Sequence, residues 1–146
     1  MKITIKGAGW QKHVMLHAAS VYFAKKLGML NKKRTKVVVE LIPGMQARLK
    51  CRGEAHQNSK KSFRIKLDSS LKPMSLVKCL AHEMIHVHQW ISGQMEDLCW
   101  TRYQVKWGKR IYYPSKLAYR KHPWEIQAHK FEDSLYRSFA MAWDAR

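Results

Sequence analysis

The sequence has few cysteines, few acidic residues and no long apolar run, and each shortage excludes a class of protein. Its 3 cysteines are odd in number and form no C-x-x-C pair. They indicate neither a disulfide framework nor a zinc ribbon, and we expect reduced thiols. No apolar run approaches the roughly 20 residues that span a bilayer. Residues 1–6 alternate apolar and polar side chains, unlike a signal peptide. We expect a protein made and kept in a cytoplasm, without a membrane segment.

The shortage of acidic residues leaves a formal charge of +18, from 28 Lys and Arg against 10 Asp and Glu. The charge is uneven, because residues 1–75 carry 17 basic residues against 3 acidic ones. Dense positive charge on a small chain favours contact with DNA or RNA through the release of counterions. The alternative is a cationic surface without a specific partner. The residues expected at a nucleic-acid contact are Lys32, Lys33, Arg34, Lys36, Lys60 and Lys61.

Length and hydrophobic periodicity predict one α+β domain over residues 1–146. The expected order is a strand at 1–6, a helix at 10–27, a strand at 36–42, a loop with a ragged strand at 46–61, a strand at 62–67 and a helix at 76–91. A short hairpin or extended loop at 103–113 and a helix at 124–143, opened by Pro123, follow. We expect the three strands to form one small antiparallel sheet, which packs on the three helices. Ser75 is the expected N-cap of the central helix, and Gly93 marks its end.

The most informative segment is His82-Glu83-Met84-Ile85-His86, an H-E-x-x-H pattern inside the expected central helix. Side chains four positions apart share one face of a helix, so His82 and His86 can reach one metal ion with Glu83 beside it. Two imidazoles that hold Zn²⁺, and a carboxylate that takes a proton from water, are the groups that hydrolysis of a peptide bond needs. The alternative is a chance match in a histidine-rich chain.

A catalytic zinc ion takes three protein ligands as a rule, so a third must come from elsewhere in the chain. The expected C-terminal helix offers Glu125, His129 and Glu132 on one face. We favour Glu125, because the small Ala128 one turn later would let this helix approach the central helix closely. His129 and Glu132 remain open as ligands, and a solvated polar stripe is the alternative for all three.

Three blocks of the chain, in this order, resemble small zinc metallopeptidases of bacteriophages, of the SprT-like or minimal gluzincin type. They are Leu80-Ala81-His82-Glu83-Met84-Ile85-His86-Val87-His88-Gln89-Trp90, then Trp107-Gly108-Lys109, then Pro123-Trp124-Glu125-Ile126-Gln127-Ala128-His129. The resemblance implies a zincin-like fold, with zinc held by the two motif histidines and Glu125, and a bacterial host cytoplasm as the location. Gln127 stands where such segments often carry an acid, and the zinc-ribbon cysteines of many SprT-like proteins are absent.

These observations predict a zinc-dependent metalloendopeptidase, with Glu83 as general base and a protein or peptide as substrate. One of Tyr103, Tyr112, Tyr113 and Tyr119 would stabilise the oxyanion, and aromatic packing is the alternative for each. The other predicted function is a basic nucleic-acid-associated protein with a structural or vestigial zinc site. A fourth protein ligand that closes the site would favour this second function.

Overall fold

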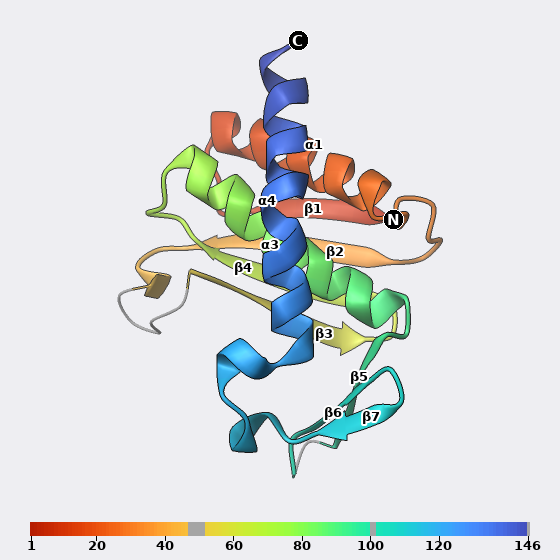
Figure 1. The fold of residues 1–146 in the computed structure, drawn as a ribbon. Helices are drawn as coiled ribbons and strands as arrows, with labels where there is room; N and C mark the ends of the chain where they lie inside the picture. The colour runs from red at the N-terminus through yellow and green to blue at the C-terminus, as the bar shows by residue number, and fades with distance from the viewer. Residues whose placement is uncertain (47–51, 100–101, 146) are drawn as a thin grey trace.

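The computed structural model describes residues 1–46, 52–99 and 102–145, and over these residues the fold is a mixed α+β arrangement (Figure 1). The elements are β1 (Lys2–Lys6), α1 (Trp10–Lys26), β2 (Lys36–Ile42), β3 (Gly53–Ser59), β4 (Ser62–Asp68), α3 (Pro73–Ile91), β5 (Met95–Cys99), β6 (Gln104–Trp107), β7 (Arg110–Tyr112), the 3-10 turns η1 (Pro114–Lys116) and η2 (Tyr119–Lys121), and α4 (Pro123–Asp144). The α+β class is thereby confirmed.

The larger sheet has the strand order β1-β2-β4-β3, and it corrects the expectation of an antiparallel sheet. β1 pairs with β2 in parallel, β2 pairs with β4 in parallel, and only β3 runs antiparallel to its neighbour β4. Alternation of side chains reports which face is buried and carries no information about strand direction. Strand direction depends instead on the connections. The chain leaves β1, returns along α1 and then enters β2 in the same direction as β1.

The segment expected as a loop with a ragged strand contains β3, which forms a hairpin with β4 across Lys60 and Lys61. The part of that segment at 47–51 lies outside the described residues. Among the strands that the structure describes, β3 pairs with β4 alone and is therefore an edge of the sheet. This edge strand borders the site described below.

α3 begins at Pro73 rather than after the expected N-cap, Ser75. Lys72 has an extended backbone and precedes the helix, and Pro73 occupies the first helical turn, where its missing N–H costs nothing. The helix ends at Ile91, and Gly93 follows with a φ of 78°, which a glycine adopts without strain. The central helix is therefore confirmed, with a start three residues earlier than its expected first residue.

The expected hairpin around Gly108 and the expected C-terminal helix are also confirmed. β6 and β7 form the hairpin around Gly108, and β5 adds a third strand that the sequence pattern did not indicate. α4 opens at Pro123, as expected. No helix in the described ranges is both long enough and apolar enough to cross a membrane.

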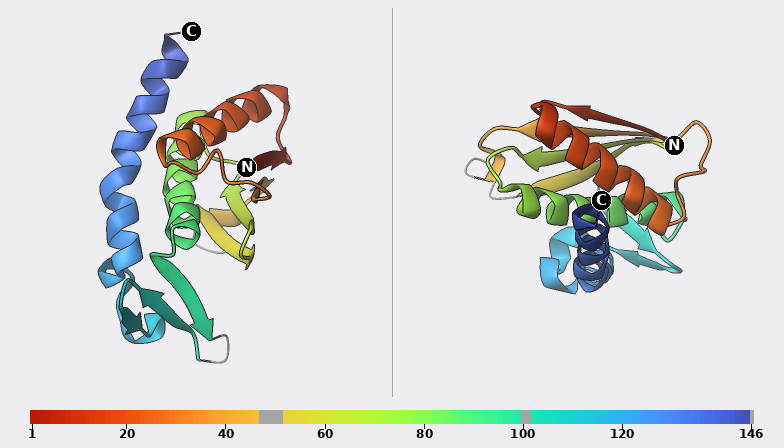
Figure 2. Two further views of the ribbon diagram at one scale, coloured as in Figure 1. Left: turned by 90° about the vertical axis from the view of Figure 1, so that its right-hand side faces the viewer. Right: turned by 90° about the horizontal axis from the view of Figure 1, so that it is seen from above.

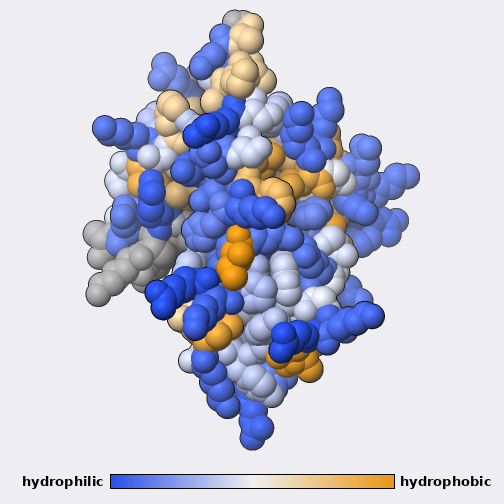
Figure 3. Space-filling view, viewed as in Figure 1, coloured by the Kyte–Doolittle hydropathy of each residue, from blue (hydrophilic) through white to orange (hydrophobic). Residues whose placement is uncertain are grey.

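The core lies between the larger sheet and the two helices α1 and α3, and α4 packs on the outer side of these helices (Figure 2). Phe139 joins α4 to this core, because its ring lies 5.7 Å from that of Phe23 on α1. On the face that carries α4, hydrophilic side chains dominate and apolar ones form separate patches (Figure 3). The first turn of α4, which carries Glu125, is held against α3 by the hydrogen bond from Gln89 to the Trp124 carbonyl.

We expect Phe139→Ala to lower the free energy of unfolding by about 3–5 kcal/mol, because it leaves a cavity where α4 meets α1. Phe131→Ala is the matched control, since Phe131 lies on the same helix and its exposed fraction is 48% against 5% for Phe139. The control should change the stability by less than about 0.5 kcal/mol. Urea denaturation measures both, and equal losses would contradict this account of how α4 docks.

Candidate metal centre

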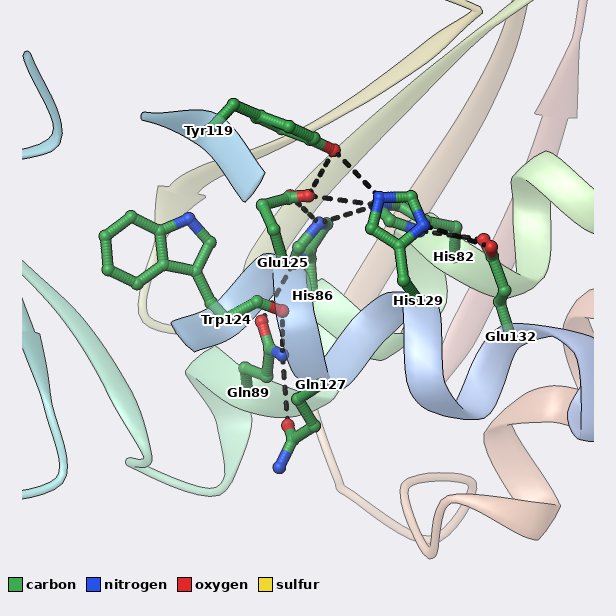
Figure 4. A network of polar contacts seen from close by, with 9 residues as sticks. All are labelled: His82, His86, Gln89, Tyr119, Trp124, Glu125, Gln127, His129 and Glu132. Carbon is green, nitrogen blue, oxygen red and sulfur yellow. Dashed lines mark hydrogen bonds and ion pairs between the residues drawn. The ribbon is translucent and has the colours of Figure 1, made fainter. Parts of the chain in front are cut away.

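Three side chains from two helices converge on one point (Figure 4). His82 and His86 project from successive turns of α3, and Glu125 projects from the first turn of α4. The Nε2 atoms of the two histidines are 3.1 Å apart. The Glu125 carboxylate lies 2.6 Å from Nε2 of His86 and 3.3 Å from Nε2 of His82. All three side chains are buried.

The spacing of these atoms fits the ligand set of a zinc ion. Ligand atoms about 2.0–2.1 Å from a tetrahedral zinc stand about 3.3 Å from one another. The His82–His86 and His82–Glu125 distances of 3.1 and 3.3 Å match that spacing. The His86–Glu125 distance of 2.6 Å is instead that of a short charge-assisted hydrogen bond, which a metal ion would replace.

The outer nitrogen of His86 is held by a buried amide that the sequence analysis did not single out. Nδ1 of His86 donates to Oε1 of Gln89 at 2.8 Å. The Gln89 amide nitrogen donates in turn to the Trp124 carbonyl and to Oε1 of Gln127, which fixes which end of the amide faces His86. Nε2 of His86 is therefore the nitrogen that faces Glu125 and whose lone pair a metal ion would use once the proton on it is lost. Gln127 serves this network as an acceptor.

The outer nitrogen of His82 is held by Glu132. Nδ1 of His82 donates to Oε2 of Glu132 at 2.9 Å, and Nδ1 of His129 lies 3.1 Å from the other oxygen of the same carboxylate. The geometry thus gives Glu132 the part of an outer partner rather than that of a ligand. A carboxylate in this position orients an imidazole and raises its basicity toward a metal.

His129 is the remaining alternative for the third ligand. Ligand atoms of His82, Glu125 and His129 lie within 4.8 Å of one another, which is close enough for one metal ion. However, His129 is exposed, and its Nε2 atom lies 3.4 Å from the Tyr119 hydroxyl. Glu125 is buried and approaches both motif histidines, so it fits the ligand position better.

Glu83 is buried on α3 and lines the same cavity as the two histidines. Burial raises the pKa of Glu83 to about 6, although the nearby His86 and His82 act in the opposite direction. A carboxylate with such a pKa can accept a proton near neutral pH and give it up again. Gly53 on β3 makes room for it, because a Cβ at this position would lie 3.3 Å from Oε1 of Glu83.

One of the four candidate tyrosines reaches the centre. The Tyr119 hydroxyl, at the start of η2, donates to Oε2 of Glu125 at 2.5 Å. Tyr103 lines the same cavity, and burial raises its pKa. Tyr112 packs edge-on against Trp124, whereas the Tyr113 hydroxyl accepts a hydrogen bond from Gln104. The structure therefore distinguishes Tyr119, which the sequence pattern did not.

The neighbouring carboxylates favour the charged forms of the two histidines. Burial disfavours the His82 imidazolium, but the hydrogen bond to Glu125 and the neighbouring carboxylates outweigh it and raise the pKa of His82 to about 9. The pKa of His86 is raised by the same balance. Burial would raise the pKa of Glu125, yet its hydrogen bonds with both histidines lower it below its usual range. A divalent cation would supply the same positive charge.

The centre opens into a cavity of about 750 Å³, with Gly53, Glu54 and Ala55 of β3 on one wall and α3 and α4 on the others. His88 lies outside it. This histidine is partly buried, and burial lowers its pKa.

Four of the six residues expected to contact nucleic acid line a second cavity: Lys32, Lys33, Lys60 and Lys61. The parallel pairing of β2 with β4 brings the two basic segments together, and the Lys36 amide donates to the Lys61 carbonyl at 2.8 Å. Arg34 and Lys36 do not line this cavity. Whether nucleic acid binds there stays a prediction.

Comparison of the chain with protein-family models, with curated proteins and with solved structures found no match. The likeness to phage metallopeptidases therefore rests on the motifs of the sequence.

We expect His82→Ala and Glu125→Ala to lose bound zinc, because each removes one of three ligands. Glu132→Gln should keep the metal with an affinity lowered about 10- to 100-fold, as is usual for an outer partner. Elemental analysis and titration against a chelator measure both effects. Full zinc occupancy in His82→Ala and Glu125→Ala would rule out this ligand set, and loss of zinc from His129→Ala alone would assign His129 in place of Glu125.

We expect zinc binding at pH 7 to release at least one proton, because the raised pKa of His82, about 9, keeps its imidazole charged in the metal-free protein. The apparent affinity should rise with pH from 7 toward 9, since the competing proton is lost over that window. Glu132→Gln should lower the number of protons released. Calorimetry in buffers of different ionisation enthalpy counts the protons, and a count of zero would contradict the charge balance described here.

Proposed function

We propose that this protein is a zincin-like, zinc-dependent peptidase, with His82, His86 and Glu125 as metal ligands. One observation carries the proposal: the three side chains meet at the floor of an open cavity that the buried Glu83 also lines. A catalytic zinc site needs three protein ligands and one open position, and the open cavity leaves room for that position.

Zinc, when bound, supplies a Lewis acid that polarises a carbonyl and lowers the pKa of water. The chain supplies the proton transfers and the orientation. Glu83, with its raised pKa, takes a proton from the attacking water and passes it to the leaving amine. The Tyr119 hydroxyl is a donor within reach of the cavity, and once Glu125 turns to the metal it can donate to the oxyanion of the substrate.

The edge of β3 offers a place for an extended peptide. The Asp68 amide donates to the Arg52 carbonyl, so Arg52 and Asp68 form a hydrogen-bonded pair. Such pairs occur at every second residue of an antiparallel ladder, so the residues between them turn their backbone groups outward. Gly53, Ala55 and Gln57 therefore direct their backbone groups away from β4. A peptide that adds to this edge would bond with these groups, and its chain would pass beside Glu83.

The second candidate function is a structural zinc site in a nucleic-acid-associated protein, and His129 is the observation that favours it. If His129 joined His82, His86 and Glu125 as a fourth ligand, the site would be closed to substrate. Against this reading, the His129 imidazole is exposed, whereas His82, His86 and Glu125 are buried.

We expect Glu83→Gln to lower the rate of peptide hydrolysis at least about 100-fold while the fold and zinc content stay unchanged, because Gln keeps the shape but cannot accept the proton. Glu54→Gln is the matched control, since Glu54 lines the same cavity and interacts with His56. It should keep most of the activity.

A peptide library derived from a whole proteome, read by mass spectrometry, is the substrate that avoids a choice of sequence. If the zinc-loaded parent protein cleaves no peptide in such a library, the peptidase proposal fails. Equal rates for Glu83→Gln and the parent would show that another group is the base.

A further inference from the structure

The cavity at the candidate metal centre adjoins the second, lysine-lined cavity. Trp90 and Met95 line both cavities. Strand β3 runs along the two in succession, since residues 52–55 line the first cavity and Gln57 and Lys60 line the second. The two cavities are therefore neighbours along β3, and we refer to them together as the groove.

The far end of this groove is basic. Lys32 and Lys33 come from the segment before β2, and Lys60 and Lys61 come from the β3–β4 turn. All four side chains are exposed, and within the described ranges no ion pair joins them to a carboxylate. Glu96 and Asp97 also line this cavity, so the four lysines outnumber the acids by two.

The distance between the two ends suits a polypeptide in extended form. Ala55 lines the cavity of the candidate metal centre, and Ser59, the last residue of β3, follows it by four residues, which along a strand is about 13 Å. Lys60 and Lys61 lie in the turn just beyond. A substrate chain that adds to β3 beside Glu83 keeps the same rise per residue. Its side chains about four to six positions from the bond beside Glu83 therefore reach the lysines.

We propose that the groove selects peptides that carry acidic residues about four to six positions to one side of the cleaved bond. This inference rests on the proposed function, because the metal centre defines where the bond lies. Surface lysines near a carboxylate contribute a small free energy each, so several of them on one wall favour a cluster of acids over a single one.

Two observations favour an acidic polypeptide over a nucleic acid. The backbone groups of Gly53, Ala55 and Gln57 present the hydrogen-bond pattern of a strand, which a polypeptide can match and a phosphodiester chain cannot. In addition, Trp90 is stacked against Phe63 at 6.1 Å between ring centroids. One face of the indole is thus covered, which makes it part of the wall rather than a free platform for bases.

Binding tests the lysines independently of catalysis. The zinc-loaded Glu83→Gln variant is titrated into a fluorescein-labelled flexible peptide with a run of Glu, into the same peptide with Gln in place of Glu, and into an oligothymidylate. We expect the acidic peptide to bind most tightly at low salt, with an affinity that falls as salt is added. Adding Lys60→Ala and Lys61→Ala should weaken its binding about 3- to 10-fold.

Lys2→Ala with Lys6→Ala is the matched control, because it removes the same charge from β1, the opposite edge of the sheet. Equal weakening in the two double variants, or equal affinity for the acidic and neutral peptides, would overturn the proposal. Lysine-dependent binding of the oligothymidylate without binding of the acidic peptide would assign the groove to nucleic acid instead.

Cleavage sites in the proteome-derived library separate this inference from the function on which it rests. Enrichment of Asp and Glu four to six positions from the cut bond, lost when Lys60 and Lys61 are replaced, supports both. Cleavage without that enrichment keeps the peptidase and overturns the acidic preference. Lysine-dependent binding of the acidic peptide without any cleavage keeps the groove and rejects the peptidase.

Discussion

The buried amide of Gln89 is the contact on which the geometry of the metal centre depends. Its oxygen accepts from His86 on α3, and its nitrogen donates to the Trp124 carbonyl at the start of α4. Glu125 is the next residue along the chain, so one amide fixes both an imidazole and the position of Glu125, the proposed third ligand. Because Gln89 is fully buried, loss of any of these bonds would leave a polar group unsatisfied in the core. The register of α3 against α4 is thus coupled to the site.

Charge balance is the second constraint on the centre. Glu83, Glu125 and Glu132 surround His82 within a mostly buried volume, and isolated carboxylates are costly in such a place. The metal-free protein meets this cost with a proton on the His82 imidazole, whose pKa is raised to about 9. A divalent cation would meet it with a fixed charge and free the imidazole lone pairs. The same carboxylates can therefore balance the charge of either a protonated imidazole or a bound cation.

The parts of this fold set by local pattern were predictable, and those set by packing between distant segments were not. Helical spacing placed His82 and His86 on one face, and Pro123 marked the start of α4, because both depend on neighbours along the chain. Strand direction in the sheet and the role of Gln89 depend on how elements dock, which a single sequence does not record.

The basic residues illustrate the same division. Two separate lysine pairs were visible in the sequence, but only the pairing of β2 with β4 brings Lys33 and Lys61 to one cavity. Tyr119 was one of four equivalent candidates until the chain between β7 and α4 placed its hydroxyl on Glu125. Spacing could not distinguish it, because that segment has no periodic pattern.

A crystal structure of the zinc-loaded protein, with anomalous data collected at the zinc edge, tests the central claim most directly. The account predicts one anomalous peak about 2.0–2.1 Å from Nε2 of His82, Nε2 of His86 and the Glu125 carboxylate, with a fourth position open to the cavity. A peak coordinated by His129 as a fourth protein ligand, or no peak between α3 and α4, would contradict it.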